Sequence, residues 1–122
     1  MLIALLIAGG ALGAAARYIA DGFVQERSRG VLPWGTFAVN VSGAFLLGVL
    51  TGATLYHGLG PLPRAAVGTG FCGAYTTFST FSYETVRLLE EGSIAAASVS
   101  ALASVAVGLL AAAAGIAVVA AW

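Results

Sequence analysis

The stretch Gly73-Ala-Tyr-Thr-Thr-Phe-Ser-Thr-Phe-Ser82 lies in the middle of an apolar segment that is long enough to cross a membrane. It contains five serine and threonine residues and three aromatic rings. Inside a lipid bilayer, such polar groups must be satisfied by the protein itself or by something that passes through it. The stretch is therefore a candidate pore or binding site within a membrane-spanning helix.

The composition of the 122-residue chain is that of an integral membrane protein rather than a soluble domain. It is 60% hydrophobic and 8% charged, with a mean hydropathy of +0.99 and a formal net charge of zero. Five arginines, no lysine and five acidic residues are too few and too scattered to form a nucleic-acid surface or a basic lipid-binding patch. The single cysteine, Cys72, cannot form an internal disulfide and is interpreted as a small buried hydrophobic residue.

Charged residues divide the chain into apolar segments of about the length that a transmembrane helix needs, roughly 20 residues or more. We expect an all-α membrane protein, a single domain over residues 1–122 with four transmembrane helices per subunit. The expected helices cover residues 2–25, 34–56, 64–89 and 94–122. The first segment could instead be a cleaved signal peptide, because Ala14-Ala-Ala16 resembles a cleavage site, but no charged side chain precedes the apolar run.

The arginines give only a weak preference for one orientation in the membrane. With both termini on one side, Arg64 lies on that side, whereas Arg27, Arg29 and Arg87 lie on the other. The sequence is therefore compatible with insertion in both orientations. Because four helices are too few to wall off an aqueous path alone, we expect a homodimer, and an antiparallel one would agree with dual insertion.

The third expected helix contains residues that weaken a helix. Serine and threonine side chains compete for backbone hydrogen bonds, and Gly73 is conformationally permissive, so we expect this helix to be broken near its middle. A break frees backbone carbonyl oxygens, which suit a hard cation such as Na⁺. The alternative is an ordinary helix whose hydroxyls bond back to their own backbone.

Phe78 and Phe81 are three residues apart and would share one face of a helix. The edge of an aromatic ring carries positive partial charge, so two rings that present their edges could attract a small anion without any net charge. Ordinary core packing is the alternative interpretation of this pair.

Two other helices carry polar residues four apart, which places each pair on one face. In the second helix, Thr36 and Asn40 form such a pair, and the amide of Asn40 supplies two donors that suit transient binding of an anion. An interhelical hydrogen bond is the alternative use of this amide. In the fourth helix, Ser100 and Ser104 would either extend a ladder of hydroxyls or bond back to their own helix.

The chain offers little for catalysis or for proton-coupled transport. The acidic residues are expected at helix ends or in loops, with Glu84 the least clear case, and the only histidine, His57, falls in an expected loop. No nucleophile–base pair or metal-ligand cluster stands out, so we predict that the protein is not an enzyme. Arg17 is the one charge expected within a helix, where it would draw anions into a vestibule or extend to the membrane surface.

Several of these residues together resemble a known family. The segment Thr36-Phe-Ala-Val-Asn40 with Gly43, followed by Gly70-Phe-Cys-Gly-Ala-Tyr-Thr-Thr-Phe-Ser-Thr-Phe-Ser82, closely resembles the Fluc (CrcB) fluoride channels, as does the glycine-rich first helix with Arg17-Tyr18. The resemblance spans essentially the whole chain in length and helix number. It implies a dual-topology antiparallel homodimer with two pores, through which fluoride leaves the bacterial cytoplasm passively across the plasma membrane.

The resemblance also implies roles for individual residues. The backbone carbonyls of Gly73 and Thr76, one set from each subunit, would hold a structural Na⁺ ion at the centre of the dimer. Arg17 would lie in the vestibule. The expected fluoride pore residues are the two phenylalanines, the amide and their polar neighbours: Phe78, Phe81, Asn40, Thr36, Ser79, Thr80 and, from the fourth helix, Ser104.

Two other classes of protein share this size and helix number. A small dual-topology multidrug transporter would need a carboxylate embedded in the membrane, and the first helix offers none before Asp21 near its end. A non-transporting tetraspan assembly protein would account for glycine pairs such as Gly48 and Gly52, but not for the cluster of hydroxyls and rings.

Overall fold

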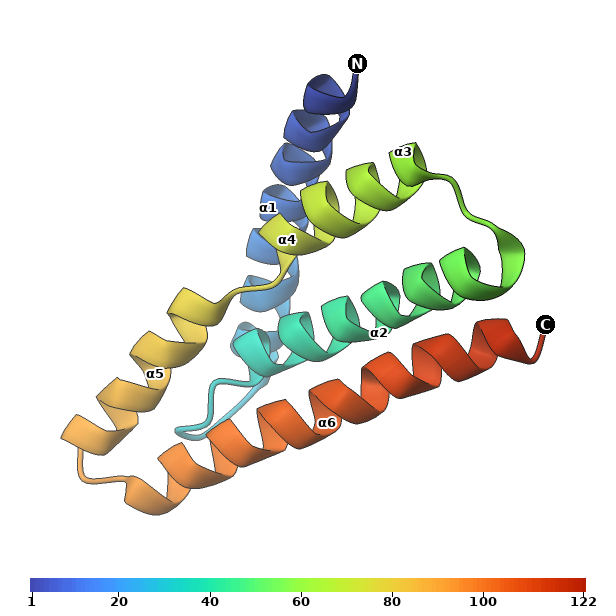
Figure 1. Ribbon diagram of the computed structural model, residues 1–122. Coiled ribbons are helices and arrows are strands. Elements are labelled where there is room, and N and C mark those ends of the chain that lie inside the picture. Colours follow the sequence, from blue (N-terminus) through green and yellow to red (C-terminus); the bar gives the residue numbers. More distant parts are fainter.

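Three long helices frame the protein, and the computed structural model describes all residues from 1 to 122 (Figure 1). Helix α1 spans Leu2–Arg27, α2 spans Trp34–His57 and α6 spans Ile94–Ala120. Each of them is long and apolar enough to cross a membrane. His57, expected in a loop, is the last residue of α2.

The remaining span is divided into two halves that lie between α2 and α6 in the chain. Its first half comprises α3 (Pro61–Pro63), the π-helix η1 (Arg64–Cys72) and α4 (Gly73–Tyr75), and its second half is α5 (Phe78–Glu90). With 13 residues and a rise of about 1.5 Å per residue, α5 is about 20 Å long and cannot cross a hydrocarbon core of about 30 Å by itself. Both halves are needed for one crossing, so the protein is an all-helical, multi-pass membrane protein.

The expected bend in the third helix is present, but it does not lie at the glycine. Gly73 has ordinary helical dihedral angles, with φ −60° and ψ −33°. The break lies at Thr76, with φ −77° and ψ 157°, and Thr77, with φ −144° and ψ 120°. Both values are extended conformations that any residue can adopt. The conformational freedom of glycine therefore does not cause the break.

The first half of the broken helix packs closely against α1, and this contact depends on glycine. A Cβ atom on Gly13 would overlap the carbonyl group of Phe71, and one on Gly70 would lie 3.0 Å from the carbonyl oxygen of Leu6. In this region the chain is π-helical rather than α-helical, a form that is rare and is frequent at functional sites. The sequence pattern did not predict this wider helix.

Helices α2 and α6 form the most extensive contact and run side by side in the same direction (Figure 1). A Cβ atom on Gly48 would overlap the carbonyl oxygen of Ala112, and one on Gly115 would overlap that of Phe45. Small residues let the backbones of two helices approach closely, which strengthens van der Waals contact where lipid offers no hydrophobic driving force. The broken helix packs against this pair of helices.

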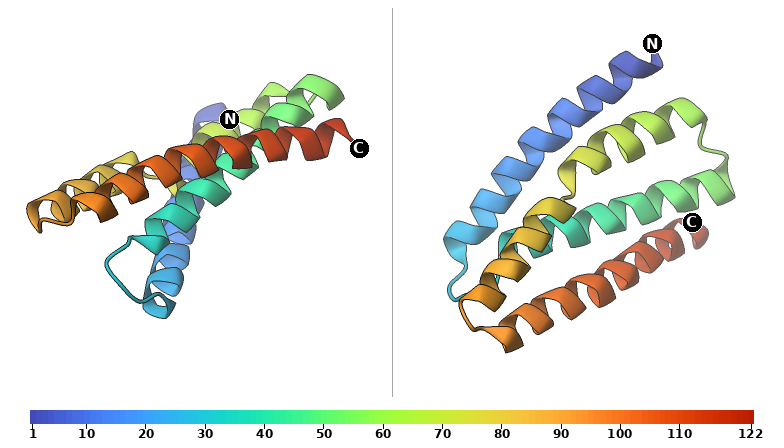
Figure 2. Two further views of the ribbon diagram at one scale, coloured as in Figure 1. Left: turned by 90° about the horizontal axis from the view of Figure 1, so that it is seen from below. Right: turned by 60° about the vertical axis from the view of Figure 1, so that its left-hand side comes forward.

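Both termini lie at the same end of the molecule, as an even number of crossings requires. The connections from α1 to α2 and from α5 to α6 lie together at the opposite end (Figure 2). The break sits between these two ends, deep within the membrane-spanning part of the protein. Any polar side chain near it must therefore find a partner within the protein.

Candidate functional site

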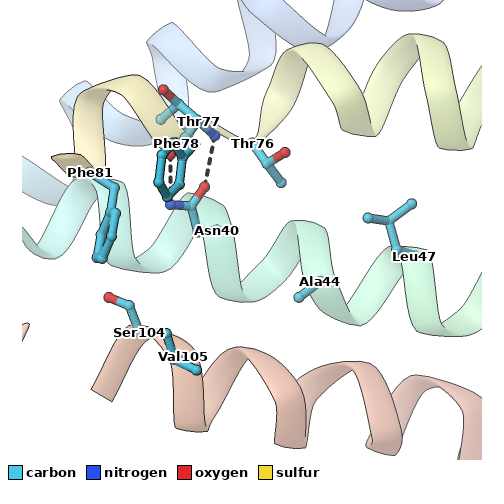
Figure 3. Close-up of a pocket in the computed structure, with 9 residues that line it drawn as sticks. All are labelled: Asn40, Ala44, Leu47, Thr76, Thr77, Phe78, Phe81, Ser104 and Val105. Carbon is cyan, nitrogen blue, oxygen red and sulfur yellow. Dashed lines mark hydrogen bonds between the residues drawn. The ribbon is translucent and has the colours of Figure 1, made fainter. Parts of the chain in front are cut away.

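A groove of about 310 Å³ lies beside the break, between α2, α5 and α6 (Figure 3). Four of the predicted pore residues share this groove, namely Asn40, Phe78, Phe81 and Ser104. The other lining residues are Ala44, Leu47, Thr76, Thr77 and Val105. No charged side chain lines it. Its polar groups are amides and hydroxyls, and the rest of its wall is apolar or aromatic.

Asn40 holds the break against α2 through two hydrogen bonds. The backbone N–H of Thr77 donates to Asn40 Oδ1 at 2.8 Å, and Asn40 Nδ2 donates to the carbonyl oxygen of Thr77 at 3.0 Å (Figure 3). The interhelical hydrogen bond, which was one of the two uses expected for the Asn40 amide, is thus formed. Because the amide nitrogen carries two hydrogens, one donor stays free for a ligand in the groove. Asn40 can therefore hold Thr77 in place and still donate a hydrogen bond to a ligand in the groove.

Thr77 caps the N-terminus of α5. Its side-chain oxygen accepts a hydrogen bond from the backbone N–H of Thr80 at 3.2 Å and donates one to Thr80 Oγ1 at 3.0 Å. Ser79 Oγ lies 3.3 Å from the same oxygen. Since α5 begins at Phe78, a groove residue, the positive end of its helix dipole lies beside the groove. This feature favours an anion there.

Phe78 and Phe81 lie on one face of α5, as their spacing predicted. Their ring centroids are 5.9 Å apart and their planes are inclined by 38°. Phe78 is 81% exposed in the single chain, so it is not a core residue of this subunit. In a membrane, a ring so exposed faces either lipid or a second chain.

Other predicted pore residues line a second cavity on the opposite side of the break. This chamber has a volume of about 170 Å³ and includes Arg17, Thr36 and Thr80. Its remaining lining residues are Ala14, Tyr18, Asp21, Val39 and Thr77. The predicted residues therefore fall into two sets rather than one, and Thr77 borders both cavities. Ser79 lines neither cavity and instead contacts Thr77.

Two buried oxygens near the chamber have no hydrogen-bond partner. They are Thr36 Oγ1 and Glu84 Oε2, and the Glu84 carboxyl lies next to Thr36, with Asp21 nearby. The expectation that no acid lies in a helix interior is wrong, because Glu84 lies in the middle of α5 and Asp21 lies within α1. The position of the break, which the sequence did not specify, moves Glu84 inward.

The serine ladder expected on α6 is split between two places. Ser104 lines the groove, whereas Ser100, which is 8% exposed, lines a small apolar pocket with Trp34 and Phe37. Neither serine bonds back to its own helix, which was the alternative for this pair. About two turns beyond Ser104, Ala112 packs against Gly48 of α2.

The break also presents backbone oxygens of the kind that hold Na⁺. The carbonyl oxygen of Thr76 accepts no backbone hydrogen bond. The Thr77 N–H, which would reach the carbonyl oxygen of Gly73 in a continuous helix, donates to Asn40 instead. Unwound carbonyls at membrane depth are known Na⁺ ligands in transport proteins. No cluster of acidic, cysteine or histidine side chains competes for a metal ion. The residues present therefore fit a cation held by backbone oxygens.

Thr77 and Asp21 were not singled out as site residues from the sequence. Thr77 is the only residue that contacts both cavities, and Asp21 faces the chamber with Arg17. A threonine just before a helix is a common N-cap, but this signal is readable only once the start of α5 is known. The spacing of Arg17 and Asp21, four apart on α1, was readable from the sequence.

Fold and site together define a small multi-pass membrane protein whose broken helix lies between an uncharged groove and a charged chamber. The chain matches the family model described as "CrcB-like protein, Camphor Resistance (CrcB)" over residues 4–116. This protein therefore belongs to the CrcB family.

Three relatives illustrate the similarity, and all three are named as fluoride-specific ion channels. The chain is 54% identical to "Fluoride-specific ion channel FluC 1" of Streptomyces avermitilis, over 92% of this chain and 90% of the relative. It is 49% identical to "Fluoride-specific ion channel FluC" of Acidobacterium capsulatum, over 84% and 83% of the two chains. It is also 49% identical to the FluC protein of Geobacter sulfurreducens, over 88% and 87%.

Proposed function

We propose that this protein is a fluoride-specific ion channel that lets fluoride leave a bacterial cell passively across the plasma membrane. The observation that carries the proposal is the groove at the break, where Asn40, Phe78, Phe81 and Ser104 come together without a charged side chain. The names of the relatives support the same function. The whole chain acts as one channel domain, and it is not an enzyme.

The mechanism is replacement of the water shell of fluoride by weak, uncharged partners. These are the free N–H of Asn40, the hydroxyl of Ser104 and the ring edges of Phe78 and Phe81. A neutral hydrogen bond contributes about 0.5–1.5 kcal/mol, and a bond to a charged group about 1.5–3 kcal/mol. Conduction needs binding that is strong enough for entry and weak enough for exit. A fixed cation in the groove would hold the ion too tightly.

The chamber on the other side of the break serves as the vestibule. Arg17 attracts the anion, and the hydroxyls of Thr36 and Thr80 offer it donors. Asp21, also in the chamber, limits how strongly the anion is held. Thr77 borders both cavities and so lies at the passage between vestibule and groove.

The channel works as an antiparallel homodimer with two pores. In the single chain the groove is open along one side and Phe78 is 81% exposed, so a second subunit is needed to close the path. Gly73 supports the same arrangement, because a Cβ atom there would meet nothing within its own chain. A second chain that approaches closely at this level would explain why glycine is used.

The carbonyl oxygens of Gly73 and Thr76 from both subunits would hold a structural Na⁺ ion at the centre of the dimer. When bound, the ion would neutralise the negative ends of these carbonyl groups, of which that of Thr76 accepts no backbone hydrogen bond. The break is maintained because the Thr77 N–H donates to Asn40 Oδ1 instead of to the carbonyl oxygen of Gly73. The ion and this hydrogen bond thus stabilise the same feature.

A small multidrug transporter is the nearest alternative, because Glu84 provides the embedded carboxylate that such a transporter needs. The relatives favour the channel over it, and over a non-transporting assembly protein. The test is a fluoride electrode outside vesicles that contain the purified protein and trapped fluoride. We expect rapid fluoride release and no release of trapped chloride. Vesicles that retain fluoride as well as protein-free ones do would refute the channel.

A further inference from the structure

Besides the hydrogen bonds between Asn40 and the backbone of Thr77, a pair of side chains links the region of the break to α2. The hydroxyl oxygens of Ser42 and Tyr75 lie 2.9 Å apart, at the end of the first half of the broken helix. We call this hydrogen bond the phenol anchor. Asn40 holds the chain just after the break, and the phenol anchor holds it just before.

The direction of the phenol anchor follows from the other contacts of Ser42. The Ser42 hydroxyl donates to the carbonyl oxygen of Ala38 at 2.7 Å, so its single hydrogen is already used. Tyr75 is therefore the donor and Ser42 the acceptor. The Tyr75 ring is stacked on Phe71, with centroids 5.5 Å apart and planes inclined by 15°. Stacking at the ring and a hydrogen bond at its tip together fix the side chain.

The surface of α2 matches the break residue by residue. Asn40 pairs with Thr77 and Ser42 with Tyr75, and Gly43 lies against the residue between them, Thr76. A Cβ atom on Gly43 would overlap the methyl group of Thr76 and lie 3.3 Å from the Tyr75 ring. Three consecutive residues, Tyr75 before the break and Thr76 and Thr77 within it, are thus placed by three residues of α2.

Thr76 lies between the two anchors, and its carbonyl oxygen accepts no backbone hydrogen bond. Gly73 lies two residues before Tyr75, and its usual helical partner, the Thr77 N–H, donates to Asn40. The anchors at Tyr75 and Thr77 therefore help to set the direction of both carbonyl oxygens. We propose, resting on the sodium site of the proposed function, that Ser42 and Tyr75 are positioning residues that preorganise the backbone oxygens for Na⁺. Preorganised ligands bind more tightly because less ordering is required on binding.

The phenol anchor persists in a membrane because a free phenol in hydrocarbon is costly. Both hydroxyls lie on the exposed side of the single chain, where water is absent once the protein is in lipid or in a dimer. Each hydroxyl then depends on the other, or on a group of the second subunit. The hydrogen bond between Ser42 and Tyr75 therefore stabilises the backbone beside the proposed sodium site.

The experiment measures the unfolding temperature of the purified full-length protein as sodium replaces choline at constant ionic strength. Tyr75→Phe and Ser42→Ala each remove one side of the phenol anchor. We expect each to raise the sodium concentration for half-maximal stabilisation by about threefold to tenfold, the factor that one hydrogen bond contributes. The double variant should shift it no further, because both changes remove the same bond. Ser42→Thr keeps the hydroxyl and should restore the wild-type value.

Tyr83→Phe and Ser98→Ala are the matched controls. Tyr83 is 68% exposed and Ser98 is exposed on α6, and neither belongs to the phenol anchor. Both should leave the sodium midpoint unchanged. Equal destabilisation of the anchor variants at every sodium concentration, with no shift in midpoint, would mean a purely structural bond and overturn the inference. A wild-type protein whose unfolding ignores sodium would overturn it too.

Failure of the proposed function would look different. Wild-type vesicles would then retain fluoride at every sodium concentration, whatever the unfolding experiment shows. Release of fluoride by the wild type, with sodium midpoints that are the same in all variants, would keep the channel and reject the positioning role. If one anchor variant fails to fold, the other measures the same bond.

Discussion

The groove and the chamber lie on opposite sides of one break, and they differ in whether charged side chains line them. The groove is lined by amide, hydroxyl, aromatic and aliphatic groups without a charge, whereas the chamber contains Arg17 and Asp21, with Glu84 close by. A charge acts over a distance, so it gathers ions in a wide space. Uncharged donors act only on contact, so they suit the place where the ion sheds its water and must leave again.

A single polar stripe in a sequence can face two separate cavities. Thr36 and Asn40 are one helical turn apart on α2, yet Thr36 faces the chamber and Asn40 faces the groove. Thr77, which is bonded to Asn40, borders both cavities. Variants in the groove and variants in the chamber should therefore fail in different ways.

The largest effect is expected for Asn40→Asp, which places a carboxylate in the groove. Two like charges 4 Å apart repel by about 4 kcal/mol at an effective dielectric constant of about 20, which corresponds to about a thousandfold in rate. The change also removes the donor to the Thr77 carbonyl oxygen. Fluoride release from vesicles measures it. Wild-type release by this variant would place Asn40 outside the path.

Phe81→Ile and Phe78→Ile should come next, since they keep apolar volume but remove the ring edges. If the attraction of a ring edge for an anion is similar to that of a ring face for a cation, each ring contributes about 1–2 kcal/mol, or about tenfold in release rate. Phe45→Ile is the matched control, because Phe45 is exposed on α2 and lines neither cavity. Equal rates in all three variants would reject the ring-edge role.

Ser104→Ala removes one hydroxyl from the groove and nothing else. A hydrogen bond to a charged ion is worth at least about 1.5 kcal/mol, so release should slow by about tenfold. Ser100→Ala provides the comparison, since Ser100 is on the same helix but lines a different pocket. We expect that change to leave the fluoride rate close to the wild-type value. A larger effect at Ser100 than at Ser104 would move the path to the other side of α6.

Arg17→Gln should give the smallest effect, about twofold to fourfold at moderate salt, because it weakens attraction into the chamber rather than binding in the groove. The effect should shrink as ionic strength rises, since salt screens charges about 8 Å apart or more at 0.15 M. Arg17→Lys keeps the charge and serves as control. A loss of rate that is unaffected by salt would mean that Arg17 contacts the ion inside the narrow path.

Much of the site was predictable because its residue types are unusual in a membrane. Hydroxyls, an amide and an arginine are costly in lipid, so the residue types alone pointed to function at Thr76–Ser82, Asn40 and Arg17. The helical spacing of Phe78 and Phe81 also placed them on one face. The division of the residues into two cavities was not predictable, because it depends on where the helix breaks.

The position of the break shows most clearly what could not be predicted from the sequence. Local reasoning predicted a break near the middle of the helix from the hydroxyl residues and Gly73 together; Gly73 is helical, and the break lies at the two threonines, which are extended. The decisive partner is Asn40, which is 37 residues away in the sequence. A hydrogen bond from a distant helix outweighs local propensity, because an unpaired backbone group in a membrane costs more than a residue's preference for one conformation.

The repeated membrane crossings, the interruption of the third crossing and membership of the CrcB family could be read from the sequence, because hydrophobicity, polar exceptions and motif order are properties of the chain. The position of the interruption, the division of Thr36 and Asn40 between two cavities and the burial of Glu84 Oε2 could be read only from the packed helices. These depend on contacts between distant helices, and such contacts exist only after α1, α2 and α5 have packed together.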